Sequence, residues 1–282
     1  MDMGYNEENC DFGGYPMYLG ELMVCHLKKM HDHFWWQFPL GVVVGILAVV
    51  LAAFLFLLIA CLFVDQKKKQ QHDNLFYRGM MYFYIRIVMV VLRVRVHTKG
   101  LEQTPKNGRF LLVCNHLSDA DPVILNYFFR KSQLAFITKR ENTSMFIVGP
   151  LMHKTMCQPI NRENDREALK TILECIRLIK EDEVSVAVFP EGRIEGDGLL
   201  HHFRSGVFKI AQKTKVPIVV CTLKNPAEIF VNLPKLKPTD VWLNLIKVIQ
   251  PEDYAEMNTV QIADTVYHLM AQDLGSELVA QE

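Results

Sequence analysis

Residues 110–121, with the sequence FLLVCNHLSDAD, join a short apolar run to a histidine and an aspartate five positions apart. The run 110–114 has the length and composition of a strand buried on both faces, as in parallel sheets. His116 follows this strand closely, so we expect it at the carboxyl end of the strand, the edge at which open α/β sheets bind ligands. Asp121 begins a stretch, 121–129, that predicts a helix.

Short apolar runs alternate with amphipathic stretches along the rest of this region. The clearest helix is 163–180, where Leu169, Ile172 and Ile176 recur at helical spacing with charges opposite. Further strands are predicted at 134–138, 184–189, 216–222 and 241–249, and further helices at 203–213 and 256–272. This alternation predicts an α/β domain with a mixed, largely parallel sheet flanked by helices.

Residues 38–64 form a run of 27 positions without a charge, preceded by Phe34, Trp35 and Trp36. About 20 apolar residues suffice to cross a bilayer as a helix, and aromatic residues are typical of the membrane interface. The run therefore predicts one N-terminal transmembrane helix; the alternative is a deeply buried core helix. A cleaved signal peptide is disfavoured because the run starts late, is long and follows an acidic stretch.

Charges on either side of this run indicate its orientation. Residues 1–37 contain six acidic residues against Lys28 and Lys29, whereas Lys67, Lys68 and Lys69 follow the run. The positive-inside rule then places the carboxyl-terminal side in the cytoplasm. We therefore predict a non-cytoplasmic tail (1–37), a single transmembrane helix (38–64), a basic linker with an interfacial helix (65–96) and a cytoplasmic catalytic domain (97–282).

The interfacial helix is predicted from a second apolar region, residues 74–96. Four arginines interrupt it, at positions 78, 86, 93 and 95, and aromatic residues are interspersed. Arginine side chains that reach the headgroups and aromatic rings at that level are typical of a helix lying in the membrane interface. The alternative is a core helix of the soluble domain.

Composition excludes several classes of function. The chain carries 31 basic and 31 acidic residues, so it lacks the basic excess of nucleic-acid-binding proteins. Its seven cysteines are widely spaced without a C-x-x-C pair, which disfavours both a disulfide framework and a zinc site. Cysteines in apolar surroundings behave as small hydrophobic residues, and this usage is typical of a reducing compartment.

Near His116 several residues compete for a chemical role. Asp121 can hold one ring nitrogen and leave the other free as a general base, although Asp119 is an alternative partner. Ser118 and Cys114 are alternative nucleophiles. A turn role is favoured for Ser118, which lies two residues from His116, and a core position for Cys114, which falls on the opposite face of its strand.

Three further motifs carry little information one by one. The sequence FPEGRI (189–194) ends a predicted strand, where Gly192 permits close backbone approach and Arg193 offers a planar fork for phosphate. Taken alone, it is more simply a turn with an exposed arginine. The block 149–162 ends in QPINR and supplies Arg162, and VPIVV (216–220) is a strand with a proline at its start.

Together, in this order and spacing, the four motifs resemble those of the glycerolipid acyltransferases, specifically the 1-acylglycerol-3-phosphate acyltransferases. That family has N-H-x4-D, a glycine-to-arginine block, F-P-E-G with a nearby arginine, and V-P-[IV]; the resemblance covers roughly residues 75–225. It implies that His116 is the general base and that Asp121 orients it. It also implies that Glu191 and Gly192 shape the acceptor site and that Arg162 and Arg193 contact the acceptor phosphate.

The resemblance implies a membrane enzyme that moves a fatty acyl group from acyl-CoA or acyl carrier protein to the sn-2 hydroxyl of lysophosphatidic acid. No metal or organic cofactor is expected, and the partners are the bilayer, the lysophospholipid and the acyl donor, with no nucleic acid. Alternatives are another lysophospholipid or glycerol 3-phosphate as acceptor, a non-catalytic lipid-binding protein, and a lipid hydrolase that uses Ser118 or Cys114.

This sequence departs from the family pattern at three positions. Arg193 follows Gly192 directly, where the commonest form reads F-P-E-G-T-R-S. Met156 stands where the family often has glycine, and Asn161 where it often has aspartate. Because the arginine of the third motif helps to recognise the headgroup, these departures bear on which acceptor is used.

Overall fold

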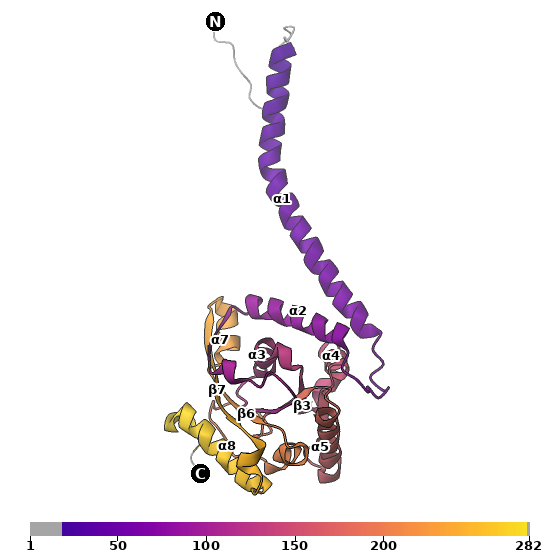
Figure 1. The fold of residues 1–282 in the computed structure, drawn as a ribbon. Coiled ribbons are helices and arrows are strands. Elements are labelled where there is room, and N and C mark those ends of the chain that lie inside the picture. Colours follow the sequence, from indigo (N-terminus) through magenta and orange to yellow (C-terminus); the bar gives the residue numbers. More distant parts are fainter. Residues whose placement is uncertain (1–18, 281–282) are drawn as a thin grey trace. The chain divides into compact units, whose positions relative to one another are not determined.

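The structure is a computed structural model that describes the backbone of residues 19–280 and the side chains from residue 37 onward (Figure 1). It divides into two units, Met1–Ala60 and Cys61–Glu282, each of which is described by itself. Residues 1–18 of the predicted tail lie outside the described residues. The bounds of the four predicted segments therefore remain predictions.

The first unit contains most of one long helix, α1 (Leu19–Leu62), which begins before the predicted transmembrane run. Within its stretch Gln37–Leu62, the most apolar window of 18 residues has a mean hydropathy of 3.3, and only 6% of that window is buried. A helix of this length and composition can cross a membrane. The low burial disfavours the alternative of a core helix, because a core helix buries its apolar side chains in the protein.

The second unit is built on a seven-stranded sheet in the order β1-β7-β6-β2-β5-β3-β4. The strands are β1 (Val94–Lys99), β2 (Leu111–Cys114), β3 (Leu134–Lys139), β4 (Gln158–Ile160), β5 (Ser185–Val188), β6 (Ile218–Lys224) and β7 (Thr239–Ile249). All neighbours are parallel except β6 and β7, which are antiparallel. The predicted mixed, largely parallel sheet is confirmed.

Helices cover both faces of this sheet. They are α2 (Leu75–Val91), α3 (Asp121–Phe128), α4 (Val148–Lys154), α5 (Asp165–Lys180), α6 (Lys209–Thr214), α7 (Glu228–Asn232) and α8 (Thr259–Leu274). Alternate residues of the central strands enter separate cores: Leu111 and Val113 pack with α5, α6 and α8, whereas Leu112 and Cys114 pack with α2, α3 and α7. This two-sided burial explains why the strands read as uninterrupted apolar runs.

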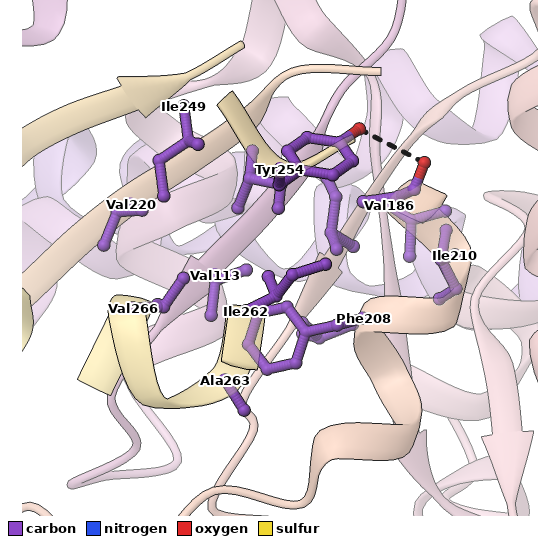
Figure 2. Packing of buried hydrophobic residues seen from close by; sticks show 14 of the residues in the cluster. Val113, Val186, Phe208, Ile210, Val220, Ile249, Tyr254, Ile262, Ala263 and Val266 are labelled. Carbon is purple, nitrogen blue, oxygen red and sulfur yellow. Dashed lines mark hydrogen bonds between the residues drawn. The ribbon is translucent and has the colours of Figure 1, made fainter. Parts of the chain in front are cut away.

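Figure 2 shows the first of these cores, where Val113, Val186 and Val220 of three adjacent strands meet side chains of α6 and α8. Phe208 is fully buried at its centre. Tyr254 closes one edge of the core, and its hydroxyl donates to the backbone carbonyls of Val216 at 2.6 Å and Ala211 at 3.2 Å. A buried hydroxyl without such acceptors would destabilise the fold by about 1–3 kcal/mol.

The region 74–96 differs from the single interfacial helix predicted for it. Helix α2 ends at Val91, and residues from Val94 form β1, which pairs with β7. Alternation of Val94 and Val96 with exposed polar residues is the period-two signal of a strand. Strand β1 therefore begins three residues before the boundary predicted at residue 97.

Helix α2 has two different apolar faces. Its inner face buries Ile85 and Met89 against the sheet, as the core-helix alternative expects, while Phe76, Phe83 and Val90 on other faces stay exposed. Arg78, expected at the headgroups, is only 2% exposed. It pairs with Asp73 at 2.5 Å and donates to the carbonyls of Leu134 and Thr155, which explains how its charge is buried.

Two short elements inside the block 149–162 have no counterpart in the sequence-based elements: α4 and the edge strand β4. Strand β4 has only three residues, including Pro159, and pairs with β3 alone. A proline is tolerated there because an edge strand has one unpaired side. The helix predicted at 203–213 is a 3₁₀ turn followed by α6.

Candidate active site

The polar residues of the first and third motifs meet where β2 and β5 end. These strands are parallel neighbours, so the segments that follow them, 115–121 and 189–193, leave the same edge of the sheet side by side. Asn115 fixes the first segment, because its side-chain amide bonds both the N–H and the carbonyl of Leu223 on β6, at 2.7 and 2.9 Å. The sequence pattern did not predict this role for the asparagine.

His116 is oriented by a buried carboxylate and an aromatic ring. Its Nδ1 lies 2.9 Å from Oδ2 of Asp121, which is fully buried at the start of α3. With a carboxylate at Nδ1, that nitrogen carries the hydrogen and Nε2 keeps a lone pair. The imidazole also stacks on Phe189, with ring centroids 4.0 Å apart and planes 12° apart.

Asp121 also organises the loop that carries His116. Its Oδ2 accepts the backbone N–H groups of Leu117 at 2.7 Å and Ser118 at 2.9 Å. Burial raises the pKa of Asp121, while the hydrogen bonds from His116 and from these two backbone groups act in the opposite direction. The local spacing produces this arrangement, because a turn followed by a helix start brings Asp121, five positions after His116, back to the imidazole.

The competing residues near His116 have other surroundings. Asp119 is exposed, and Asp121 is the carboxylate that contacts the imidazole. Ser118 is buried, and its Oγ accepts the N–H of Ala120 at 3.3 Å, as expected for a turn residue. Cys114 is fully buried in the core, and burial raises the pKa of its thiol well above the ordinary value, which makes it a poor nucleophile.

Glu191 links the two segments. Its Oε1 accepts the backbone N–H of His116 at 2.7 Å, and its Oε2 accepts that of His201 at 3.0 Å. The side chain is only 7% exposed, and burial raises its pKa to about 7 despite both hydrogen bonds. Glu191 therefore holds the backbone next to His116 and belongs to the site through that contact.

The arginines of the site differ in their contacts. Arg193 points its guanidinium at Glu195, and its side chain is 67% exposed. Arg162 follows the edge strand β4 and is partly buried. Burial, and then the charge of Arg204, lower the pKa of Arg162. Sequence reasoning did not single out Arg204, since it lies twelve residues after Gly192 without a motif around it.

Other features of the second unit lie apart from this edge. Two grooves, of about 520 and 660 Å³, run along α2 and are lined by residues that include Arg86 and Tyr127. Neither is lined by His116 or Glu191. Across residues 37–280, no three His, Cys, Asp or Glu side chains are grouped as metal ligands. The expectation that the chemistry needs no cofactor stays a prediction.

Comparison with known proteins finds similarity to acyltransferases. Residues 95–224 match a family model described as Acyltransferase. The chain is 26% identical over 200 residues to a 1-acyl-sn-glycerol-3-phosphate acyltransferase of Cocos nucifera, covering 70% of this chain and 64% of that protein. It is 25% identical over 194 residues to one of Borreliella burgdorferi, covering 65% and 74%.

A third relative, from Chlamydomonas reinhardtii and of the same name, is 30% identical over 177 residues, with 62% of this chain and 51% of that protein covered. The chain thus spans between about half and three quarters of the length of these three relatives. The fold is similar to the crystal structure of PlsC, the 1-acyl-sn-glycerophosphate acyltransferase of Thermotoga maritima. The TM-score is 0.60 at 21% identity, covering 80% of this chain and 89% of that one.

Proposed function

Because the chain belongs to the acyltransferase family that includes the 1-acyl-sn-glycerol-3-phosphate acyltransferases, we propose that it acylates the sn-2 hydroxyl of lysophosphatidic acid to give phosphatidic acid. The acyl donor is acyl-CoA or acyl carrier protein. The observation that carries the proposal is the contact of 2.9 Å between His116 and a fully buried Asp121 at the carboxyl edge of the sheet.

In the proposed reaction His116 is the general base. Its Nε2 takes the proton of the acceptor hydroxyl as that oxygen forms a bond to the thioester carbonyl carbon. The carbon–sulfur bond then breaks, and the thiolate leaves with the proton from His116. Asp121 stabilises the imidazolium between these two steps and keeps the tautomer in which Nε2 is free at the start.

The proposed acceptor site lies at the same edge of the sheet as His116. Glu191 and Gly192 shape it next to His116, and Arg162 supplies a guanidinium for the acceptor phosphate. A contact of Arg193 with that phosphate remains a prediction, because it requires the side chain to leave Glu195. Holding the hydroxyl next to its base gives much of the rate enhancement expected of such a site.

We propose a single-pass membrane protein with its catalytic domain in the cytoplasm. The apolar stretch Gln37–Leu62 supports an anchor, and Lys67, Lys68 and Lys69 support the orientation. Exposed apolar side chains of α2, together with Met145 and Phe146, fit a face that touches the bilayer. The proposed partners are therefore the membrane, a lysophospholipid and the acyl donor.

The alternatives predict different products. Another lysophospholipid or glycerol 3-phosphate as acceptor keeps the chemistry and changes only the preferred substrate in a panel of acceptors. A hydrolase would release free fatty acid through a covalent intermediate, which the turn contact of Ser118 and the buried Cys114 disfavour. A non-catalytic lipid-binding protein would retain its biological activity after loss of His116.

The testing experiment measures phosphatidic acid formed from oleoyl-CoA and lysophosphatidic acid by the full chain in detergent. We expect His116→Ala to lower the rate by about 10²–10⁴-fold. His97→Ala is the matched control, because this histidine is exposed on β1 and stacks on Trp242. Equal rates for wild type and His116→Ala would exclude the base role, and no product from wild type would exclude this acceptor.

A further inference from the structure

The imidazole of His116 is held at one edge and on one face. At the edge, Nδ1 lies 2.9 Å from Oδ2 of Asp121. On the face, the ring of Phe189 lies with its centroid 4.0 Å away and its plane 12° from parallel. The χ2 torsion of histidine is broad, so one hydrogen bond leaves the ring plane room to tilt. The stacked phenyl ring restricts this tilt and thereby fixes the direction of the Nε2 lone pair.

A third ring fixes Phe189 in turn. Phe136 of β3 is only 4% exposed, and its ring stacks with that of Phe189 at a centroid distance of 5.8 Å and an angle of 23°. The series His116, Phe189, Phe136 follows the order β2-β5-β3 of the strands that carry or precede these residues. The sheet therefore sets the spacing of the rings, and the stack does not depend on a mobile loop.

The turn after β5 holds the backbone and the side chain of His116 by separate contacts. Glu191 accepts the backbone N–H of His116 at 2.7 Å, while Phe189 stacks on its imidazole. The N–H of Gly192 donates to the carbonyl of Phe189 at 3.0 Å and closes the turn. The motif FPEGRI thus acts on the base through its first residue, whereas the sequence assigned roles only to Glu191, Gly192 and Arg193.

An aromatic face also affects the charge that the base acquires. In the proposed reaction the imidazole of His116 takes the proton of the acceptor hydroxyl and becomes a cation until that proton is passed on. A cation within about 6 Å of a ring centroid is attracted by the negative face of the ring. At 4.0 Å, Phe189 is well within this range. The attraction exists only while the imidazole is charged, so it lowers the barrier without strengthening substrate binding.

We propose that Phe189 is a positioning residue of the reaction, which aims the imidazole of His116 and stabilises its protonated form through the aromatic face. The inference rests on the proposed function, in which His116 is the general base. Leucine at position 189 would keep an apolar wall beside the imidazole but would lack both the flat face and the ring quadrupole. Phe189→Leu therefore separates the aromatic effect from simple burial.

The kinetic test measures kcat and KM of the full chain in detergent with oleoyl-CoA and lysophosphatidic acid. We expect Phe189→Leu to lower kcat about 2- to 30-fold with both KM values unchanged, and Phe189→Tyr to restore kcat. Phe110→Leu is the matched control, because Phe110 is fully buried at the opposite end of β2 from His116. This control is expected to lower the Tm and to leave kcat unchanged.

A second readout does not depend on activity. In the full chain labelled with ¹³C-histidine, the ring resonance of His116 is identified by its absence from His116→Ala. Protons above an aromatic ring are shielded by its ring current. We therefore expect this resonance to move downfield in Phe189→Leu and to stay in place in Phe189→Tyr and Phe110→Leu.

Three results would overturn the assignment: a wild-type kcat in Phe189→Leu, an equal loss of kcat in Phe110→Leu, or a raised KM with unchanged kcat in Phe189→Leu. The last result would place the phenyl ring against a substrate instead of the base. Absence of acylation by wild type would count against the proposed function. In that case a downfield shift in Phe189→Leu still supports the orientation of the imidazole by Phe189, and an unmoved resonance contradicts it.

Discussion

Glu191 connects, through one buried carboxyl group, the two segments that carry His116 and His201. Both of its oxygens accept backbone N–H groups, which is why the side chain tolerates a position only 7% exposed. Its ionised form is nevertheless disfavoured, because burial and the nearby Asp121 raise its pKa to about 7. At the scale of single residues, the site thus holds a carboxyl group that titrates near neutral pH.

The raised pKa of Glu191 predicts a pH-dependent stability. The pKa of Glu191 is about 7 in the folded chain, against an ordinary value of 4.5. The protonated carboxyl therefore contributes fully to the free energy of unfolding below pH 4.5, and this contribution is lost as the pH rises through 7. We expect the free energy of unfolding of wild type, relative to Glu191→Gln, to fall by up to about 3 kcal/mol over this window. Urea unfolding at several pH values measures the difference.

Only the pH-dependent part of this comparison is diagnostic. Glutamine cannot accept both backbone N–H groups, so Glu191→Gln also lowers stability by a constant amount, about 1–3 kcal/mol. A difference between the two proteins that stays flat from pH 4.5 to 7.5 would contradict the raised pKa.

Among the elements, short irregular segments position the site more than the long helices do. The loop from Gly192 to Arg204 is tied at its far end, because Leu200 exchanges backbone hydrogen bonds with Leu278 and Ala280 near the carboxyl terminus. A second short segment, α4, packs on the turn 140–144 that follows β3. Gly149 lies at this contact, where it is enclosed by backbone.

Two glycines in helices are expected to respond oppositely to alanine. A Cβ atom on Gly149 would lie 2.1 Å from the carbonyl oxygen of Thr143, whereas one on Gly79 in α2 would meet nothing within 4 Å. We expect Gly149→Ala to destabilise by about 1–3 kcal/mol, because the backbone must shift. Gly79→Ala is the matched control and is expected to stabilise by about 0.5–1 kcal/mol through its helix propensity.

Thermal unfolding of both variants in detergent measures these changes. For a domain of this size, 1 kcal/mol corresponds to a Tm shift of about 2–4 °C. A Gly149→Ala protein with the Tm of wild type would show that α4 and the turn 140–144 are not packed as described.

The whole molecule combines a helix that is long and apolar enough to cross a membrane with a domain whose two sheet faces are covered by different sets of helices. One face is closed by α5, α6 and α8, and the other by α2, α3 and α7. Net charge is zero, yet the charges are unevenly spread, with acidic residues before the apolar stretch and lysines directly after it. This asymmetry is the feature that sets the orientation proposed for the chain.

The orientation predicts which cysteines an external reagent reaches. In sealed, right-side-out vesicles that carry the full chain, a membrane-impermeant maleimide is expected to label Cys10 without permeabilisation. A cysteine introduced by Lys68→Cys is expected to react only after the membrane is opened. Peptide mass spectrometry identifies the labelled sites, and labelling of residue 68 from outside would reverse the proposed orientation.

The sequence by itself determined the features that depend on neighbours along the chain. Apolar runs located β2, β5 and β6, because strands buried on both faces leave few polar positions. Among the described residues, length and hydropathy identified one helix suited to a membrane, and a spacing of five residues anticipated the contact of His116 with Asp121. Each of these patterns involves only residues that are close in the chain, so it can be recognised without knowledge of the tertiary contacts.

Contacts between distant segments were decided only by the tertiary structure. Strand order brings Glu191 to the backbone of His116 across 75 residues, although no spacing in the chain indicates this contact. Strand β1 was hidden in an apolar helical region because its partner, β7, lies more than 140 residues away. The physical reason is the same in each case: the sheet, rather than the local sequence, sets which strand ends are adjacent.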